Sequence, residues 1–244
     1  IVSEQIELML ASRCSDEYKV RCPVVETQGK GELHFPLTLP AHDYAAVVFY
    51  PQAEKSDTNI ALSMMLSHIL SPYFFQQLRT EKQFGYLVGV GYIPVNLYPG
   101  IAFYIQSPHV ESNNIVAGID QFINSCDSLL SEMPQQQWQQ IKHGLMGQLQ
   151  EHDTSLRVRS QRFWMSLSNN DKLFTHKKLL IDAIEQLTLA EIIDYVKTKL
   201  QSNGNHIDRV VLCSDKKTIN ITKESGSVVV KDIADFINNS SFKY

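Results

Sequence analysis

The stretch Ser71-Pro-Tyr-Phe-Phe-Gln-Gln-Leu-Arg-Thr-Glu-Lys-Gln-Phe-Gly-Tyr-Leu-Val88 predicts a short helix that runs into a strand. Ser71 can cap the helix, and Pro72 suits its first turn, where a backbone donor has no partner. The apolar residues expected to face the core recur at helical spacing: Phe74, Phe75 and Leu78. This element is therefore expected to start at Ser71 and to pack through one face.

After Gly85, which permits a sharp change of direction, the apolar pattern changes to a period of two. One strand face then carries Tyr86, Val88, Val90 and Tyr92. Arg79 is placed at the end of the helix and Tyr86 at the start of the strand, so a guanidinium and a phenol project toward the same space. Spacing alone favours a plainer interpretation, with a solvated cation and an aromatic at the core edge.

The flanking segments predict the rest of a sheet. Residues 44–50 form a strand apolar enough to be central, and Ser56 is a cap candidate for the helix after it. Residues 101–106 form a strand that pairs antiparallel with the strand beginning at Tyr86. Residues 33–39 are expected to form an edge strand, because Pro36 cannot donate to a ladder.

The second half of the chain is mainly helical, with a last central strand at residues 209–213. Helices are expected after Pro108, after Pro134 and after Ser155, and a capping box at 188–191 begins another. In the helix that Ser155 caps, the residues expected to point inward are Leu156, Phe163, Trp164 and Leu167. The order of elements predicts an α+β fold, an antiparallel or mixed sheet with helices packed on one face.

The domain boundary is expected near Gly31, because residues 22–31 have the Pro, Gly and polar content of a linker. Residues 1–30 are then the tail of a preceding domain with its linker, and residues 31–244 are one domain with a sizeable core. With no Met at its first position, the chain is expected to be a piece of a larger protein.

Composition argues against several classes of protein. The formal charge is −4, which gives no electrostatic case for nucleic acid or an anionic membrane. No apolar run approaches the ~20 residues of a membrane helix, and the first residues do not form a signal peptide. The cysteines are too sparse for a disulfide framework, and free or buried thiols are favoured over a Cys14–Cys22 bridge.

A search for catalytic motifs finds no metal site. None of the eight histidines forms His-x-x-x-His or the His-x-x-Glu-His of inverted zincins. There is also no nucleophile elbow and no nucleotide-binding glycine motif. The chain alone is therefore predicted to bind no metal and to be inactive as a hydrolase.

Residues 78–86, Leu-Arg-Thr-Glu-Lys-Gln-Phe-Gly-Tyr, resemble the "LRT-x-x-Q-x-GY" segment of the pitrilysin and insulin-degrading-enzyme family of inverted-motif zinc metallopeptidases. The similarity is to the C-terminal, fourth domain of such proteins and extends to about Leu200. It implies the metallopeptidase-repeat type of α/β roll. Phe84 stands where Leu is usual, a core-facing change that leaves the motif's roles in place.

In the resembled family, the zinc ion, its ligands and the general-base Glu lie in the first domain, and the last domain closes over them. Carried over residue by residue, Arg79 and Tyr86 bind the substrate, and Tyr86 is catalytic because it assists at the scissile carbonyl. The resemblance implies zinc in the intact enzyme and none in this chain. It also implies peptide substrates and the N-terminal catalytic half of the same polypeptide as partners.

Three interpretations remain open. The first is the C-terminal domain of a pitrilysin-like zinc endopeptidase, which would be periplasmic in a bacterial pitrilysin-like protein and otherwise cytoplasmic. The second is a non-catalytic assembly homologue of the same fold, similar to processing-peptidase or core proteins. The third is a peptide-binding module that uses a sheet edge. Retention of both Arg79 and Tyr86 favours the first, since a scaffold does not need that pair.

Overall fold

The computed structural model describes residues 23–37, 43–169, 171–201, 207–215 and 227–243. Its centre is a mixed sheet of six strands in the order β4-β5-β3-β6-β2-β7, and a separate two-stranded sheet pairs β1 with β8. The strands are β1 (Val24–Val25), β2 (Glu32–Leu37), β3 (Tyr44–Pro51), β4 (Leu87–Tyr92), β5 (Gly100–Ser107), β6 (Arg209–Ser214), β7 (Val228–Val229) and β8 (Phe242–Lys243).

The helices lie mainly between β3 and β6 in the sequence. The α-helices are α2 (Asp57–Phe74), α3 (Ser112–Ser131), α4 (Gln135–Gln150), α5 (Leu156–Ser168), α6 (His176–Gln186), α7 (Leu189–Tyr195) and α8 (Ile233–Asn238). Two π-helical segments, η2 (Phe75–Glu81) and η3 (Val196–Leu200), continue α2 and α7.

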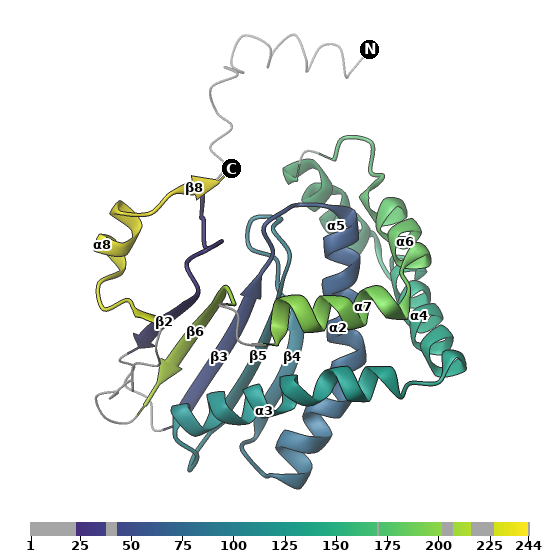
Figure 1. Cartoon of the computed structure of the whole chain (residues 1–244). Helices are drawn as coiled ribbons and strands as arrows, with labels where there is room; N and C mark the ends of the chain where they lie inside the picture. The colour runs from purple at the N-terminus through teal and green to yellow at the C-terminus, as the bar shows by residue number, and fades with distance from the viewer. Residues whose placement is uncertain (1–22, 38–42, 170, 202–206, 216–226, 244) are drawn as a thin grey trace, which may run out of the picture.

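One face of the sheet is covered by α2 and α3, and Figure 1 shows α3 and α7 lying across the strands. The largely aliphatic core between the layers contains an aromatic cluster. Phe74 of α2 packs edge-on against Phe103 of β5, with ring centroids 5.5 Å apart, and against Phe122 of α3 at 5.0 Å. The predicted fold class is confirmed: a mixed sheet carries its main helices on one face.

The strand β2 corrects one prediction, because it is not an edge strand. It runs parallel to β6 along its whole length and pairs with the short β7 on its other side. The β7 pairing covers Leu33 and His34 only and ends before Pro36, so the missing donor of the proline is tolerated. Both partners come from the C-terminal part of the chain, which a local pattern does not reveal.

The helix of the opening stretch also differs from its prediction. It does not start at Ser71; α2 begins after Ser56, whose Oγ accepts the backbone N–H of Asn59 at 3.1 Å, and passes through Pro72. The buried side chains of Phe74 and Leu78 continue the inward face across this point, so packing outweighs the local stop signal. Phe75 was predicted to be inward but is 45% exposed.

The helix α5 departs furthest from expectation. Ser155 caps it as predicted, but no residue of α5 is buried. Leu156 is 83% exposed, Trp164 is 71% exposed, and Leu167 also faces outward. Phe163 is half-buried and packs edge-on against Phe174, with ring centroids 4.8 Å apart. Periodicity identified an apolar side of this helix, but within the described chain Leu156, Trp164 and Leu167 on that side stay exposed.

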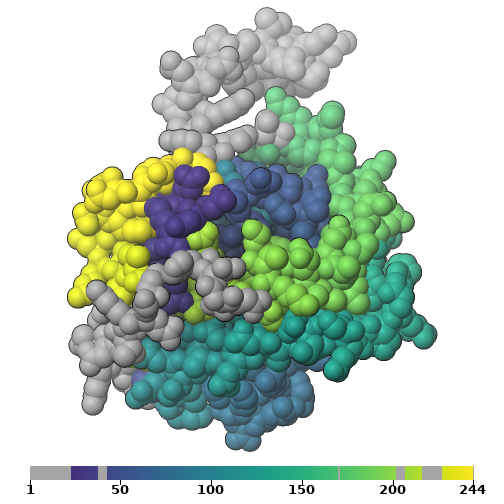
Figure 2. Space-filling view, viewed as in Figure 1, coloured from purple at the N-terminus to yellow at the C-terminus, as the bar shows by residue number. Residues whose placement is uncertain are grey.

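The two ends of the described chain meet. β1 pairs antiparallel with β8, and Figure 2 shows the C-terminal segment (yellow) beside the first strands (purple). The backbone N–H groups of Gly29 and Gly31 donate to the Asp208 carboxylate, each at 2.8 Å. Residues just before the expected boundary at Gly31 are thus held by the C-terminal part of the chain, and the boundary itself remains a prediction.

Cys126 and Cys213 are buried free thiols, as favoured from the sequence, whereas Cys14 and Cys22 lie outside the described residues. Burial raises the pKa of Cys126 to about 12 and that of Cys213 to about 11. The described helices include none with the length and apolar character to cross a membrane.

Candidate functional site

The predicted site lies at one end of the sheet, where β4 begins, β5 ends and β3 begins. In the register of these strands, Leu87 is opposite Gln106 and Gln106 is opposite Ala45. Tyr86, Gln106 and Asp43 therefore come to the same end of three adjacent strands. This placement follows from the antiparallel pairing of β3, β5 and β4.

Arg79 reaches the site from η2, whose Leu78 anchors the segment in the core. Nη1 of Arg79 donates to the backbone oxygen of Tyr86 and, at 3.4 Å, to that of Gly85. The guanidinium also lies over the ring of Phe75, 5.3 Å from its centroid. π-Helical segments are frequent at functional sites, because they shift side chains out of the regular helical register.

The structure thus brings the predicted pair together, but through the backbone of Tyr86. The Nε and Nη2 groups of Arg79 donate to no atom in the described ranges. Arg79 therefore has donors available beyond Nη1, which binds the backbone at residues 85 and 86. A guanidinium has five N–H donors in a fixed planar fork. Arg79 can therefore hold the start of β4 and still donate to a further acceptor.

Tyr86 is 54% exposed and lies immediately before β4. Its hydroxyl donates to Oδ2 of Asp43 at 2.6 Å, and Nε2 of Gln106 donates to the same oxygen at 3.0 Å. The hydrogen bond to Asp43 raises the pKa of Tyr86, so the phenol keeps its proton at neutral pH. Asp43 and Gln106 could not be identified from local sequence, because only the strand register brings them beside the motif.

Gly85 is required here for a reason different from the predicted one. The turn into β4 is made by Gln83, which has a φ of 54°. A Cβ at Gly85 would lie 2.0 Å from the backbone oxygen of Gln106, so β5 passes too close for any side chain. Phe84 is partly buried against the core, and its ring lies where a Cβ of Gly118 on α3 would be.

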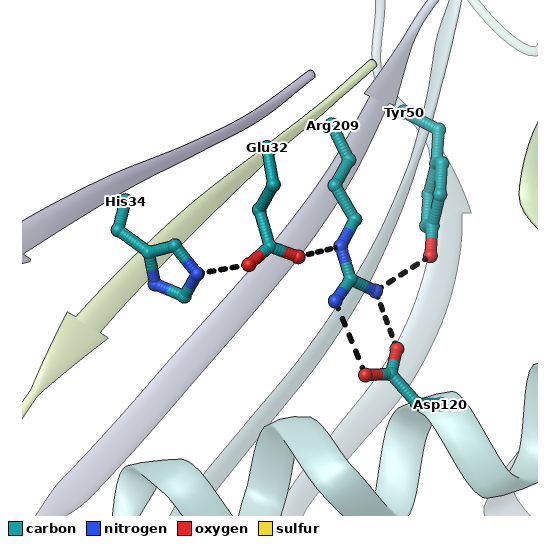
Figure 3. A network of polar contacts seen from close by, with 5 residues as sticks. All are labelled: Glu32, His34, Tyr50, Asp120 and Arg209. Carbon is teal, nitrogen blue, oxygen red and sulfur yellow. Dashed lines mark hydrogen bonds and ion pairs between the residues drawn. The ribbon is translucent and has the colours of Figure 1, made fainter. Parts of the chain in front are cut away.

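A second polar cluster lies between the sheet and α3 (Figure 3). Arg209 of β6 donates from Nε to Glu32 of β2, and its two terminal nitrogens form a bidentate pair with Asp120 of α3. Nη1 also donates to the Tyr50 hydroxyl at 3.2 Å. His34 completes the cluster through its contact with Glu32.

The electrostatics of this cluster follow from burial and pairing. Burial raises the pKa of Tyr50 to about 12. Burial would also raise the pKa of Glu32, but the His34 hydrogen bond and the Arg209 charge outweigh it and lower that pKa. All three guanidinium nitrogens of Arg209 are engaged, so the cluster joins β2, β3, β6 and α3 and serves the fold.

The described residues do not form a zinc site. Within the described parts of the chain, no three His, Cys, Asp or Glu side chains are grouped so that they could hold a metal ion. His42 and His206 lie outside those parts. The residues present therefore do not fit the zinc that the resemblance implies for an intact enzyme, and the absence of zinc from this chain remains a prediction.

Comparisons with known proteins agree with the motif. A family model described as PQQ synthase PqqF-like, C-terminal lobe domain 4, matches residues 65–164. Protease 3 of Salmonella typhi is 26% identical over 150 residues, which cover 62% of this chain and 16% of that protein. The insulin-degrading enzyme of Drosophila melanogaster is 24% identical over 199 residues, which cover 78% of this chain and 20% of that protein.

The fold comparison agrees as well. The crystal structure of pitrilysin superposes with a TM-score of 0.81 at 18% sequence identity, and the match covers 99% of this chain and 26% of that one. The fold and the sequence are similar to those of C-terminal domains of the peptidase M16 class. Within that class, the chain is homologous to a C-terminal domain of the pitrilysin and insulin-degrading-enzyme family, and it spans about a fifth of the length of these curated relatives.

Proposed function

We propose that this chain is the C-terminal domain of a pitrilysin-like endopeptidase, that it closes the peptide chamber, and that it supplies Arg79 and Tyr86 to peptide hydrolysis. The observation that carries the proposal is the contact between these two residues of the motif, at an exposed sheet end. Peptide substrates and an N-terminal catalytic half of the same polypeptide are the proposed partners.

The chemistry suits the two side chains. Peptide hydrolysis passes through a tetrahedral oxyanion, and a phenolic O–H can donate a hydrogen bond to it. A phenol is protonated at neutral pH, and the hydrogen bond to Asp43 moves the pKa of Tyr86 further upward. Arg79 offers its remaining donors to substrate carbonyl groups. In this proposal, the metal chemistry belongs to a domain outside this chain. This chain contributes substrate binding and hydrogen-bond donation.

The test is the Tyr86→Phe variant of the intact polypeptide, assayed with a fluorogenic peptide. The substitution keeps the ring and removes one donor, so kcat should fall by ~10²–10³ with little change in KM. Tyr104→Phe on neighbouring β5 is the matched control and should keep kcat near that of the wild type. A Tyr86→Phe enzyme with kcat within about twofold of wild type would refute the catalytic assignment and favour the assembly homologue.

A companion measurement concerns Arg79. If the guanidinium holds the peptide throughout the reaction, Arg79→Ala should raise KM and lower kcat together. Thermal melting of both variants separates lost activity from lost folding. A normal KM in Arg79→Ala would contradict a role of Arg79 in substrate binding. Its role would then be to hold the Tyr86 backbone.

The 244-residue chain alone should bind no stoichiometric zinc and cleave no peptide, because its described residues offer no group of three ligands. Metal analysis of the purified chain, together with the same fluorogenic assay, checks both statements. One equivalent of tightly held zinc with turnover would contradict them.

A further inference from the structure

Tyr86 is held at both of its ends. Arg79 donates a hydrogen bond to its backbone oxygen, and the Tyr86 hydroxyl donates a hydrogen bond to Asp43 at 2.6 Å. Between these two points the side chain is more than half exposed, so the hydrogen bond of its hydroxyl is important for where the ring lies. We propose that Asp43 is a positioning residue for Tyr86, with Gln106 fixing the carboxylate. The effect of Asp43 on catalysis rests on the proposed function of Tyr86.

The strand register makes this arrangement specific. Asp43 precedes β3, Gln106 lies on β5 and Tyr86 precedes β4, and these strands are hydrogen-bonded neighbours in that order. Gln106 stands between the other two and donates to the oxygen that accepts from Tyr86. The carboxylate is thus oriented by a neighbour on the central one of the three strands. A carboxylate acceptor gives a shorter and stronger hydrogen bond than a neutral one.

This contact has a consequence for catalysis. The phenol has one proton, and in the resting structure that proton is directed to Asp43. The neutral carbonyl of a bound peptide competes poorly with a carboxylate for it, whereas a tetrahedral oxyanion is a strong acceptor. The hydroxyl then turns toward the oxyanion with its O–H bond intact. Because of Asp43, the Tyr86 hydroxyl stabilises the reaction mainly when negative charge has developed on the oxyanion. Such stabilisation affects kcat more than KM.

The first test uses the 244-residue chain and needs no activity. Tyrosines labelled with ¹³C at Cζ are titrated by NMR, and the Tyr86 signal is identified by its loss in Tyr86→Phe. In the wild type the Tyr86 pKa should lie above the ordinary value of 10.0, and Asp43→Asn should lower it toward that value. Asp182→Asn, which changes an exposed carboxylate on α6, should leave it unchanged. An unchanged Tyr86 pKa in folded Asp43→Asn would overturn the proposal.

The second test is a double-mutant cycle in the intact polypeptide. Asp43→Asn should lower kcat by about 3- to 10-fold, as expected for loss of one orienting hydrogen bond, with KM within about twofold. In the Tyr86→Phe background, Asp43→Asn should have no further effect, because the two residues act as one unit. Equal losses in both backgrounds would show that Asp43 acts without Tyr86 and would overturn the proposal.

The two failures are distinguishable. If Tyr86→Phe has normal kcat while Asp43→Asn still shifts the Tyr86 pKa, the proposed function fails and the structural link between the residues stands. If Tyr86→Phe has a reduced kcat and Asp43→Asn changes neither the Tyr86 pKa nor kcat, the catalytic role of Tyr86 stands. The positioning role of Asp43 is then refuted.

Discussion

Two arginine-centred clusters in this domain differ in burial and in how fully their hydrogen bonds are used. Arg209 lies between the sheet and α3, and all three of its guanidinium nitrogens are bound by Glu32, Asp120 and Tyr50. Arg79 lies at the exposed end of the sheet and donates through Nη1 to two backbone oxygens. The first cluster ties four elements together, whereas the second holds one turn.

The difference indicates which arginine can bind a substrate. A buried guanidinium must be fully paired, since each unpaired charge in the interior is costly. Such a residue has no donor to offer a ligand. Arg79 is near solvent and keeps donors available, so it can hold Tyr86 and still bind a peptide. The position of each guanidinium in the fold therefore distinguishes the structural role of Arg209 from the binding role proposed for Arg79.

The largest expected effect is on the Arg209 cluster. Arg209→Met leaves the Glu32 and Asp120 carboxylates without their cation, and the free energy of unfolding should fall by about 3 kcal/mol. Arg79→Met is the matched control and should cost less than ~1 kcal/mol, as surface changes do. Urea unfolding of both variants measures the difference. Equal losses would remove the distinction between the clusters.

The next effect sharpens the comparison at the exposed site. Gly85→Ala places a Cβ 2.0 Å from the Gln106 backbone oxygen, so β4 or β5 must move. We expect a loss of about 1–3 kcal/mol in the free energy of unfolding. Gly91→Ala, within β4, has no atom within 4 Å of its added Cβ and should be much milder. A Gly85→Ala chain as stable as Gly91→Ala would show that the site adapts freely.

The smallest expected effect is the pH dependence of the buried cluster. The pKa of Glu32 is lower in the folded chain than its ordinary value of 4.5, so its ionised form stabilises the fold above that pH. This contribution is lost as the pH falls through the folded pKa. Glu32→Gln should therefore flatten the fall in unfolding free energy as the pH drops below the ordinary carboxyl value of 4.5. Exposed Glu132→Gln is the control, and an equal flattening there would contradict the assignment.

Several features could be predicted because their causes are local. Ser56 and Ser155 cap helices with their own side chains, and Thr188 forms the capping box with Glu191. The apolar run of β3 indicated a central strand. The motif at residues 78–86 indicated the family, and it placed Arg79 and Tyr86 near one another.

Other features could not be predicted because their causes are distant. Helix α2 continues through Pro72, since Phe74 and Leu78 are buried beyond it. Leu156 and Trp164 of α5 are exposed, although their spacing is that of a buried face. The position of β2 inside the sheet depends on β6 and β7, which arrive from the C-terminal end of the chain.

The sequence by itself determined the fold class, the family and the two residues proposed for function. Only the tertiary structure placed Asp43 on the hydroxyl of Tyr86, 43 positions away, and Glu32 on Arg209, 177 positions away. Caps, turns and periodicity act over a few residues and are therefore written in local sequence. Hydrogen bonds between distant residues depend on strand order and register, which are fixed only when the whole sheet has assembled.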